Sequence, residues 1–266
     1  MGVQLLNRSP QGVEPTHYGR ALLKRGVAVF DELKQSVRDI ESIADPGTGE
    51  LSIGCSSAQS EGFVFAVIDR LSRQYPRISI QVSLGGMLAT RQELQERRIE
   101  LGYGRLAPSP LEEITQEFLF DDPLVVVASR NNPWVRRRKV TLADLVNEPW
   151  TWVARGTMLD SIVCDAFRAK GLEPPHTTIL GDSINMRIKL IASGRFLGAL
   201  PASTLKFHEN AGVLKRLPVE LLSAHWQTGI ITLKNRMLSP LAQRFIETAR
   251  EVAKPLAKGS HSRAYR

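Results

Sequence analysis

The amino-acid sequence predicts an α/β protein with two similar lobes, preceded by a small hairpin and one long helix. Two observations carry this prediction. Patterns typical of strands and of amphipathic helices alternate in two separate runs, over residues 51–104 and 150–200. Ahead of both runs, residues 16–44 show helical periodicity throughout.

The opening residues have the pattern of a hairpin that leads into a helix. Two apolar stretches, Val3 to Leu6 and Val13, flank the turn-forming segment Arg8-Ser9-Pro10-Gln11-Gly12. Thr16 then offers a side-chain oxygen to cap a helix. Because so small a hairpin buries little surface, we expect its packing partner to lie elsewhere.

The helix predicted over residues 16–44 carries a narrow apolar stripe. At about 1.5 Å per residue it would reach about 42 Å. A long stripe with charges between its members predicts pairing with a second copy of the helix, and packing against the chain's own body is the alternative. The members of the stripe are Leu23, Phe30, Leu33, Val37 and Ile40. Asp45-Pro-Gly-Thr-Gly49 then ends the helix and predicts a hinge.

After this hinge, the first run of alternating elements predicts a parallel sheet with right-handed crossovers. Its strands are expected at 51–55, 78–84 and 101–104, with helices at 61–75 and 90–98. A further buried strand is expected at 123–129.

The second run predicts a second lobe of the same kind. Its strands are expected at 150–154, 177–180 and 196–200, with helices at 159–170 and 183–193. The last strand and helix, at 229–233 and 240–253, have no alternating neighbours and are expected to return to the first lobe. We therefore assign residues 50–128 and 228–255 to lobe 1, 129–227 to lobe 2, and 256–266 to a disordered tail.

Composition narrows the function. The formal net charge is +8 with a pI near 9.8, which suits a polyanionic partner. In the first 25 residues, four cations (Arg8, Arg20, Lys24, Arg25) against Glu14 give four minus one, a net +3.

The two cysteines are far apart and are expected to be buried thiols. No apolar run reaches the roughly 18 residues of a membrane span, so we expect a cytoplasmic protein.

Catalysis and metal binding are not indicated by the sequence. It contains no GxSxG, HExxH, Walker or GxGxxG motif, and its five histidines show no metal-ligand spacing. We therefore expect no enzyme activity, no cofactor and no metal. The four tryptophans are expected to be packing residues at lobe edges and crossovers.

Several stretches together resemble LysR-type transcriptional regulators. The opening LLNRSPQGVEPTHYG, residues 5–19, resembles the wing and linker-helix start of that family, whose pattern runs LF-x-R-x-x-x-x-x-x-LT-x-x-G. The other matches are individually weak and jointly specific, and the resemblance covers residues 3 to about 254. They are Gly49-Glu-Leu-Ser-Ile-Gly54, Tyr75-Pro-Arg-Ile78, Leu94-Gln-Glu-Arg-Arg-Ile-Glu-Leu-Gly102, Asp122-Pro-Leu-Val-Val-Val127, Thr141-Leu-Ala-Asp-Leu145, Ile191-Ala-Ser-Gly194 and Gly198-Ala-Leu-Pro201.

The resemblance implies a winged helix-turn-helix, a linker helix and a two-lobed effector domain like the periplasmic binding proteins. Residues 1–15 would then be the remnant of the wing, and 16–45 the linker and dimerisation helix of a homodimer or homotetramer. The rest of the DNA-binding domain would be missing, so that sequence-specific DNA binding is impaired. The residues expected to touch the DNA backbone are Arg8, Ser9, Thr16 and Arg20.

A small effector is expected between the lobes, where the loops that follow the strands converge. Backbone N–H groups and hydroxyls at these loops suit a carboxylate, and Arg155 could hold one in a bidentate fork. The alternatives are ordinary helix caps, and for Arg155 a surface acid. The expected contacts are Ser56, Ser57, Ala58, Gly86, Met87, Gly104, Arg155, Thr157, Ser183 and Pro201. Met87-Leu88 favours an apolar pocket and an aromatic or short branched acid.

A second class of protein fits the same pattern. A small-molecule binding protein of the two-lobed solute-receptor class would have the same lobes and no role at DNA. The sequence shows no signal peptide, and its opening resembles a wing. Both observations favour the regulator.

Overall fold

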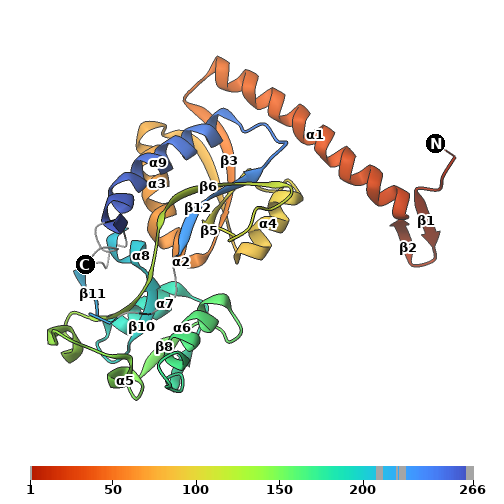
Figure 1. Ribbon diagram of the computed structural model, residues 1–266. Helices are drawn as coiled ribbons and strands as arrows, with labels where there is room; N and C mark the ends of the chain where they lie inside the picture. The colour runs from red at the N-terminus through yellow and green to blue at the C-terminus, as the bar shows by residue number, and fades with distance from the viewer. Residues whose placement is uncertain (1, 208–211, 220, 222–225, 262–266) are drawn as a thin grey trace.

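A hairpin and a long helix project from a two-lobed body in the computed structural model, which describes residues 2–207, 212–219, 221 and 226–261 (Figure 1). Strands β1 (Leu6–Ser9) and β2 (Gly12–Pro15) pair antiparallel, and α1 (His17–Ala44) follows. The turn is shorter than predicted. Arg8 and Ser9 belong to β1, since Ser9 pairs with Gly12, whose φ of +133° suits glycine alone.

Thr16 joins the hairpin to α1, as the cap pattern predicted. Its hydroxyl oxygen accepts a hydrogen bond from the Gly19 N–H at 3.1 Å and donates one to the Gln4 carbonyl at 2.7 Å. A side chain at Gly19 would place its Cβ 2.0 Å from the Leu5 carbonyl oxygen. Only glycine therefore lets the segment before the hairpin lie this close to the first turn of α1.

Lobe 1 is built on a five-stranded sheet in the order β4-β3-β5-β12-β6. The strands β3, β4 and β5 are parallel, and β12 is antiparallel to both β5 and β6. The last strand thus joins this sheet, as the sequence analysis expected. The strands are β3 (Thr48–Cys55), β4 (Arg77–Leu84), β5 (Leu101–Arg105), β6 (Ile114–Asp121) and β12 (Gln227–Leu233).

The helices of lobe 1 cover the sheet and close its core. Three aromatic rings meet there: the Phe63 ring centroid lies 4.7 Å from that of Tyr103 and 5.0 Å from that of Phe120. The helices are α2 (Ser57–Gln59), the π-helical turn η1 (Ser60–Val64), α3 (Phe65–Gln74), α4 (Met87–Gln95) and α9 (Pro240–His261).

The helix predicted over 61–75 differs in its first turn. Residues 60–64 form a π turn, and Gly62 has non-helical φ and ψ of −119° and −106°. A Cβ at Gly62 would lie 3.3 Å from the Cα of Thr204 in lobe 2. Close packing between the lobes therefore accompanies the irregular turn, and such packing cannot be read from a helical periodicity.

Lobe 2 is not the single parallel sheet that was predicted, and it includes residues 124–128, which the sequence analysis assigned to lobe 1. Strand β7 lies between β10 and β11 and is antiparallel to both, while β8 and β9 form a separate parallel pair. Every residue of β7 is buried. A continuous apolar run in the sequence therefore indicated a buried strand, but it did not indicate whether the neighbouring strands run parallel or antiparallel to it. The strands are β7 (Leu124–Ser129), β8 (Trp150–Trp152), β9 (Thr177–Leu180), β10 (Gly198–Pro201) and β11 (Leu214–Arg216).

The helices of lobe 2 pack around these small sheets. They are the 3₁₀ turn η2 (Pro133–Arg136), α5 (Leu142–Leu145), α6 (Met158–Arg168), α7 (Ile184–Ala192) and α8 (Ala202–Phe207). Trp150 and Trp152 are buried in this lobe, with ring centroids 5.5 Å apart, and Trp134 packs partly buried beside them. The predicted packing role of these tryptophans is confirmed.

The predicted disordered tail begins too early. Helix α9 passes through Pro255 and continues to His261. Leu256 and Ala257 pack partly buried against the core of lobe 1, and this tertiary contact stabilises the last turns of the helix. Residues 262–266 lie outside the described part of the chain.

Candidate functional site

The two lobes are joined at a buried carboxylate, Asp122, which lies between β6 and β7. Its side chain is 3% exposed and accepts hydrogen bonds from the Ser203 N–H at 2.8 Å and the Ser203 hydroxyl at 2.6 Å. Its backbone N–H donates to the Trp226 carbonyl at 2.9 Å. Asp122 therefore holds both strands that cross between the lobes, and the start of α8, at one point.

The loop after β3 reaches across to lobe 2. Ala58 packs against the apolar cluster formed by β7, α7 and β10, and its carbonyl accepts a hydrogen bond from the Thr204 hydroxyl at 3.4 Å. Asn185 of α7 donates to Glu61 of η1 at 2.8 Å. The expected contact residues Ser56, Ser57 and Ala58 thus lie beside the second lobe.

Two of the expected lobe 1 residues, Met87 and Gly104, lie against each other, and Gln59 links them to Ser56. The methyl group of Met87 lies where a Cβ at Gly104 would be, 2.2 Å from that position, and the amide of Gln59 lies 3.3 Å from it. Ser56 and Gln59 form a capping box at the start of α2, with N···O distances of 3.1 and 3.4 Å. The hydroxyl and N–H of Ser56 therefore already have partners within the chain.

Gly86 is the N-cap residue of α4. Unlike Ser56, it has no side chain and so forms no side-chain capping hydrogen bond. A Cβ at this position would meet no atom within 4 Å, so there is open space beside Gly86 at the start of α4. Ser57 lies one residue into α2, and its carbonyl accepts a hydrogen bond from the Ser60 hydroxyl at 2.8 Å.

In lobe 2, Arg155 is paired within its own lobe. Its guanidinium lies 3.1 Å from Asp160, which also accepts hydrogen bonds from the Trp152 indole at 2.7 Å and the Gly156 N–H at 2.9 Å. Burial alone would raise the pKa of Asp160, but these donors outweigh it and lower that pKa. Arg155 therefore pairs with an acid of its own lobe. The sequence analysis left open a pairing with a surface acid, but Asp160 is buried.

Thr157 and Ser183 act as helix caps. Thr157 accepts from the Asp160 N–H at 3.2 Å and Ser183 from the Met186 N–H at 3.3 Å. Pro201 ends β10, next to α8. That these residues also touch a ligand stays a prediction.

Arg105, which the sequence patterns did not single out, also links the two lobes. It ends β5 in lobe 1, and its guanidinium lies 3.2 Å from the sulfur of Met158 at the start of α6 in lobe 2. The guanidinium also lies 5.1 Å from the centroid of the Trp226 ring. Among the described residues, no carboxylate pairs with Arg105. Its position at the end of a parallel strand was a signal that could have found it.

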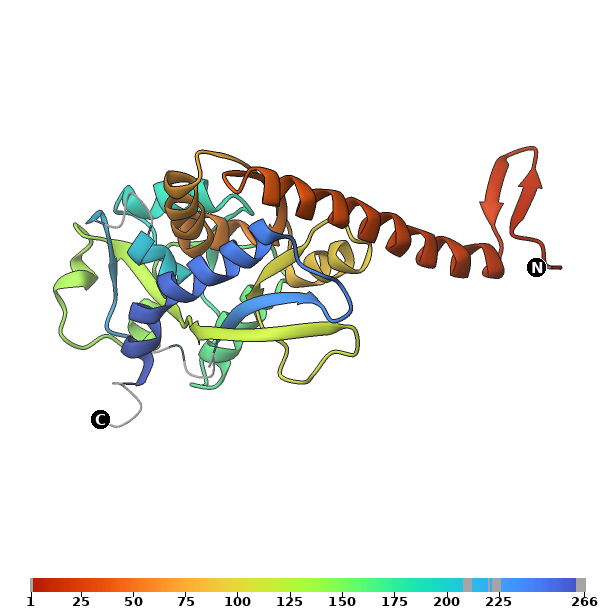
Figure 2. The same cartoon turned by 90° about the horizontal axis from the view of Figure 1, so that it is seen from above.

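The residues predicted for DNA contact and dimerisation lie on the projecting part of the chain (Figure 2). Arg8 and Ser9 are exposed on β1, and Arg20 donates to the Pro15 carbonyl at 2.9 Å. The stripe residues of α1 are exposed by 54% to 68%. Docking of α1 on its own body, the alternative, also occurs, but through a different face that carries Asp31 and Gln35.

The part of the chain that the structure describes contains neither a candidate metal site nor a candidate membrane-spanning helix. No three His, Cys, Asp or Glu side chains lie close enough to hold a metal ion. Among the described helices, none is long and apolar enough to cross a membrane. Cys55 and Cys164 are both buried free thiols, as predicted.

Comparison with known proteins identifies what this arrangement is similar to. A family model for the LysR substrate binding domain matches residues 44–254. The HTH-type transcriptional regulator YeiE of Escherichia coli K12 is 32% identical over 250 residues, which cover 93% of this chain and 82% of YeiE.

Solved structures share the fold. Full-length OxyR of Pseudomonas aeruginosa superposes with a TM-score of 0.65 at 19% identity, covering 96% of this chain and 82% of that one. The effector binding domain of QuiR in complex with shikimate gives a TM-score of 0.60 at 16% identity, covering 78% of this chain and 98% of that domain.

Protonation of Asp122 is expected to make stability depend on pH. Burial raises the pKa of this carboxyl from 3.8 to about 6, against the opposing hydrogen bonds from Ser203. Because the folded state holds its proton more tightly than the unfolded state, the stabilisation is complete below pH 3.8 and is lost as the pH rises through about 6. At roughly 1.4 kcal/mol per pKa unit, the loss amounts to about 3 kcal/mol.

Urea unfolding of the parent and of Asp122→Asn at a series of pH values measures this loss. We expect the free energy of unfolding of the parent, relative to the variant, to fall between about pH 4 and 6 and to level off above. The exposed Asp165→Asn serves as the control substitution. A difference between parent and Asp122→Asn that does not change with pH would contradict the assignment.

Proposed function

The chain belongs to the LysR family of transcriptional regulators, and we propose that it responds to a small carboxylate bound between its two lobes. In this proposal the protein is a non-enzymatic cytoplasmic regulator that pairs with a second copy through α1. The observation that carries the proposal is Arg105, a cation at the boundary of the lobes that no described carboxylate neutralises.

The placement of Arg105 suits recognition of an anion. Its guanidinium contacts only a thioether and an aromatic ring among the described residues, and both are weak partners compared with a carboxylate. The start of α6, the positive end of its helix dipole, lies beside it at Met158. A bound carboxylate would therefore gain a charge-assisted pair from lobe 1 and contacts from lobe 2 at the same time.

Arg155 is the other candidate for the charge partner. Its pairing with Asp160 makes it the weaker one, because a ligand would have to compete with an acid already held by three donors. The QuiR complex with shikimate, a carboxylic acid anion, supports the chemical class of ligand. It does not identify the ligand of this chain.

Substitution of the two arginines separates the candidates. In a calorimetric screen of metabolite carboxylic acids that includes shikimate, we expect Arg105→Gln to weaken a hit by about tenfold to over a hundredfold. This corresponds to the roughly 1.5–3 kcal/mol of a hydrogen bond to a charged group.

The exposed Arg73→Gln is the control and should leave affinity unchanged. If Arg155→Gln weakens binding and Arg105→Gln does not, the charge partner is Arg155. A hit that binds all three variants as tightly as the parent would place the ligand elsewhere.

DNA contact is proposed for the hairpin and the first turns of α1. Arg8 is exposed on β1, and Arg20 lies one turn into the helix, on the part of the molecule farthest from the lobes (Figure 2). Phosphate contacts of this kind position a protein on DNA, whereas sequence is read by an element inserted into a groove. The hairpin is expected to contribute the first kind of contact.

A polypeptide of residues 1–266 should therefore bind DNA weakly and without sequence preference. Fluorescence anisotropy with duplexes of different sequence should give similar affinities that fall steeply with salt, and Arg8→Ala with Arg20→Ala should make that fall less steep. Tight binding to one sequence at physiological salt would contradict this expectation.

Pairing through α1 is proposed from its exposed apolar face. Leu33, Phe30 and Ile40 are 59%, 68% and 67% exposed, which is unusual for large apolar side chains gathered on one helix. A hollow of about 610 Å³ lies beside this face, lined largely by apolar residues of the hairpin and α1. A second copy of α1 supplies a matching apolar face.

Light scattering of Leu33→Asp tests the pairing. We expect the parent to have the mass of a dimer or tetramer at micromolar concentration, and the variant to have a lower mass, because the charge would be buried unpaired. Gln74→Asp on the exposed face of α3 is the control. A monomeric parent, or an unchanged mass in Leu33→Asp, would show that α1 does not form the interface.

A further inference from the structure

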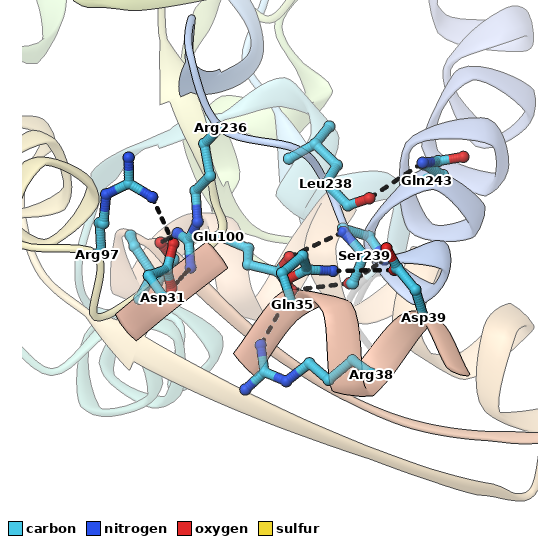
Figure 3. Close-up of polar contacts among 12 residues, drawn as sticks. Asp31, Gln35, Arg38, Asp39, Arg97, Glu100, Arg236, Leu238, Ser239 and Gln243 are labelled. Atoms are coloured by element: carbon cyan, nitrogen blue, oxygen red, sulfur yellow. Dashed lines mark hydrogen bonds and ion pairs between the residues drawn. The ribbon is translucent and has the colours of Figure 1, made fainter. Parts of the chain in front are cut away.

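The second half of α1 docks on lobe 1 through a buried polar cluster (Figure 3). Asp31 accepts hydrogen bonds from Arg97 at 2.6 Å and from Arg236 at 2.8 Å. The side chains are 13%, 14% and 3% exposed, respectively. We call these three residues the α1 latch. Arg97 follows α4 and Arg236 follows β12, so two separate segments of lobe 1 hold one carboxylate of α1.

A second polar group lies beside the latch, one turn further along α1. Gln35 is 2% exposed, and its amide lies within hydrogen-bond distance of Glu100 and of the Ser239 backbone (Figure 3). Glu100, itself 1% exposed, accepts from the Ser239 N–H at 3.0 Å and hydroxyl at 2.8 Å. The docked face of α1 is therefore polar and buried, whereas its stripe is apolar and exposed.

Arg97 has an unusual backbone. Its φ of +58° makes it the one residue other than glycine with a positive φ among those described. This left-handed conformation costs free energy for any residue with a Cβ and favours glycine. At this position the guanidinium contacts Asp31 and, at 3.2 Å, Glu32. The ion pairs with α1 therefore offset the free-energy cost of the left-handed backbone at Arg97.

The latch also lies at one end of two elements whose other end reaches the lobe boundary. Helix α4 starts at Met87, which packs on Gly104, and ends two residues before Arg97. Strand β5 starts directly after Glu100 and ends at Arg105. Because a short helix moves as a unit, a displacement of its first turn also displaces Arg97 relative to Asp31.

We propose that Asp31, Arg97 and Arg236 fix the direction of α1 relative to lobe 1. The segment 45–49, which the sequence suggested as a hinge, then does not set the direction of α1 by itself. This inference concerns contacts within one chain and does not depend on the identity of any ligand.

Distance measurements by pulsed electron paramagnetic resonance test the latch. Spin labels at Arg25→Cys in α1 and Gln74→Cys in α3 occupy exposed positions, and the native thiols are buried. Excess unlabelled chain removes distances between copies. We expect one narrow distribution in the parent and a distribution at least twice as wide in Arg97→Gln and in Asp31→Asn. The exposed pair Asp69 and Arg73, changed to Asn and Gln, is the control.

Arg97→Gly separates the latch from a general effect on folding. Glycine relieves the backbone and removes the guanidinium, so we expect a melting temperature at or above that of Arg97→Gln together with an equally wide distribution. The double variant Asp31→Asn, Arg97→Gln should be no wider than Asp31→Asn alone, because Asp31→Asn already removes the contact of Asp31 with Arg97 as well as that with Arg236. A parent-like distribution in Arg97→Gly would overturn the proposal, as would widths that add in the double variant.

Discussion

The relation between the two lobes depends on the Asp122 carboxylate. A carboxylate removed from water must be hydrogen-bonded, and here the donors come from the start of α8. Its own backbone meanwhile bonds the returning strand at Trp226. Since both crossing strands and α8 meet at this residue, the contacts of Ala58 and Gly62 with lobe 2, and the reach of Arg105 to Met158, all depend on the position it sets.

Helix caps explain much of what the sequence offered as a ligand site. A helix start leaves N–H groups without partners, and Ser56, Thr157 and Ser183 each satisfy one of them. Residues of the same types would suit a carboxylate, so the pattern alone does not separate the two uses. Arg105 differs, because its contacts are with a sulfur and a ring and no internal acid pairs with it among the described residues.

Helix α1 shows why a single helix can carry two functions. One face presents Asp31 and Gln35 to lobe 1, where buried polar groups demand specific partners and so fix one geometry. Another face presents Leu33 and Phe30, whose burial is non-directional and tolerates a range of partners. The polar face is suited to orientation, and the apolar face to association.

The sequence by itself determined the order and type of most elements, the cap at Thr16 and the family. These depend on the spacing of residues that are close in sequence. It did not determine the direction of β7, the π turn at Gly62, the continuation of α9 to His261 or the pairing of Arg155 with Asp160. Most of these depend on which segments meet in space, and so does the latch, where Asp31 meets Arg97 and Arg236 from far along the chain. Only the tertiary structure decides such contacts, because local spacing carries no information about distant partners.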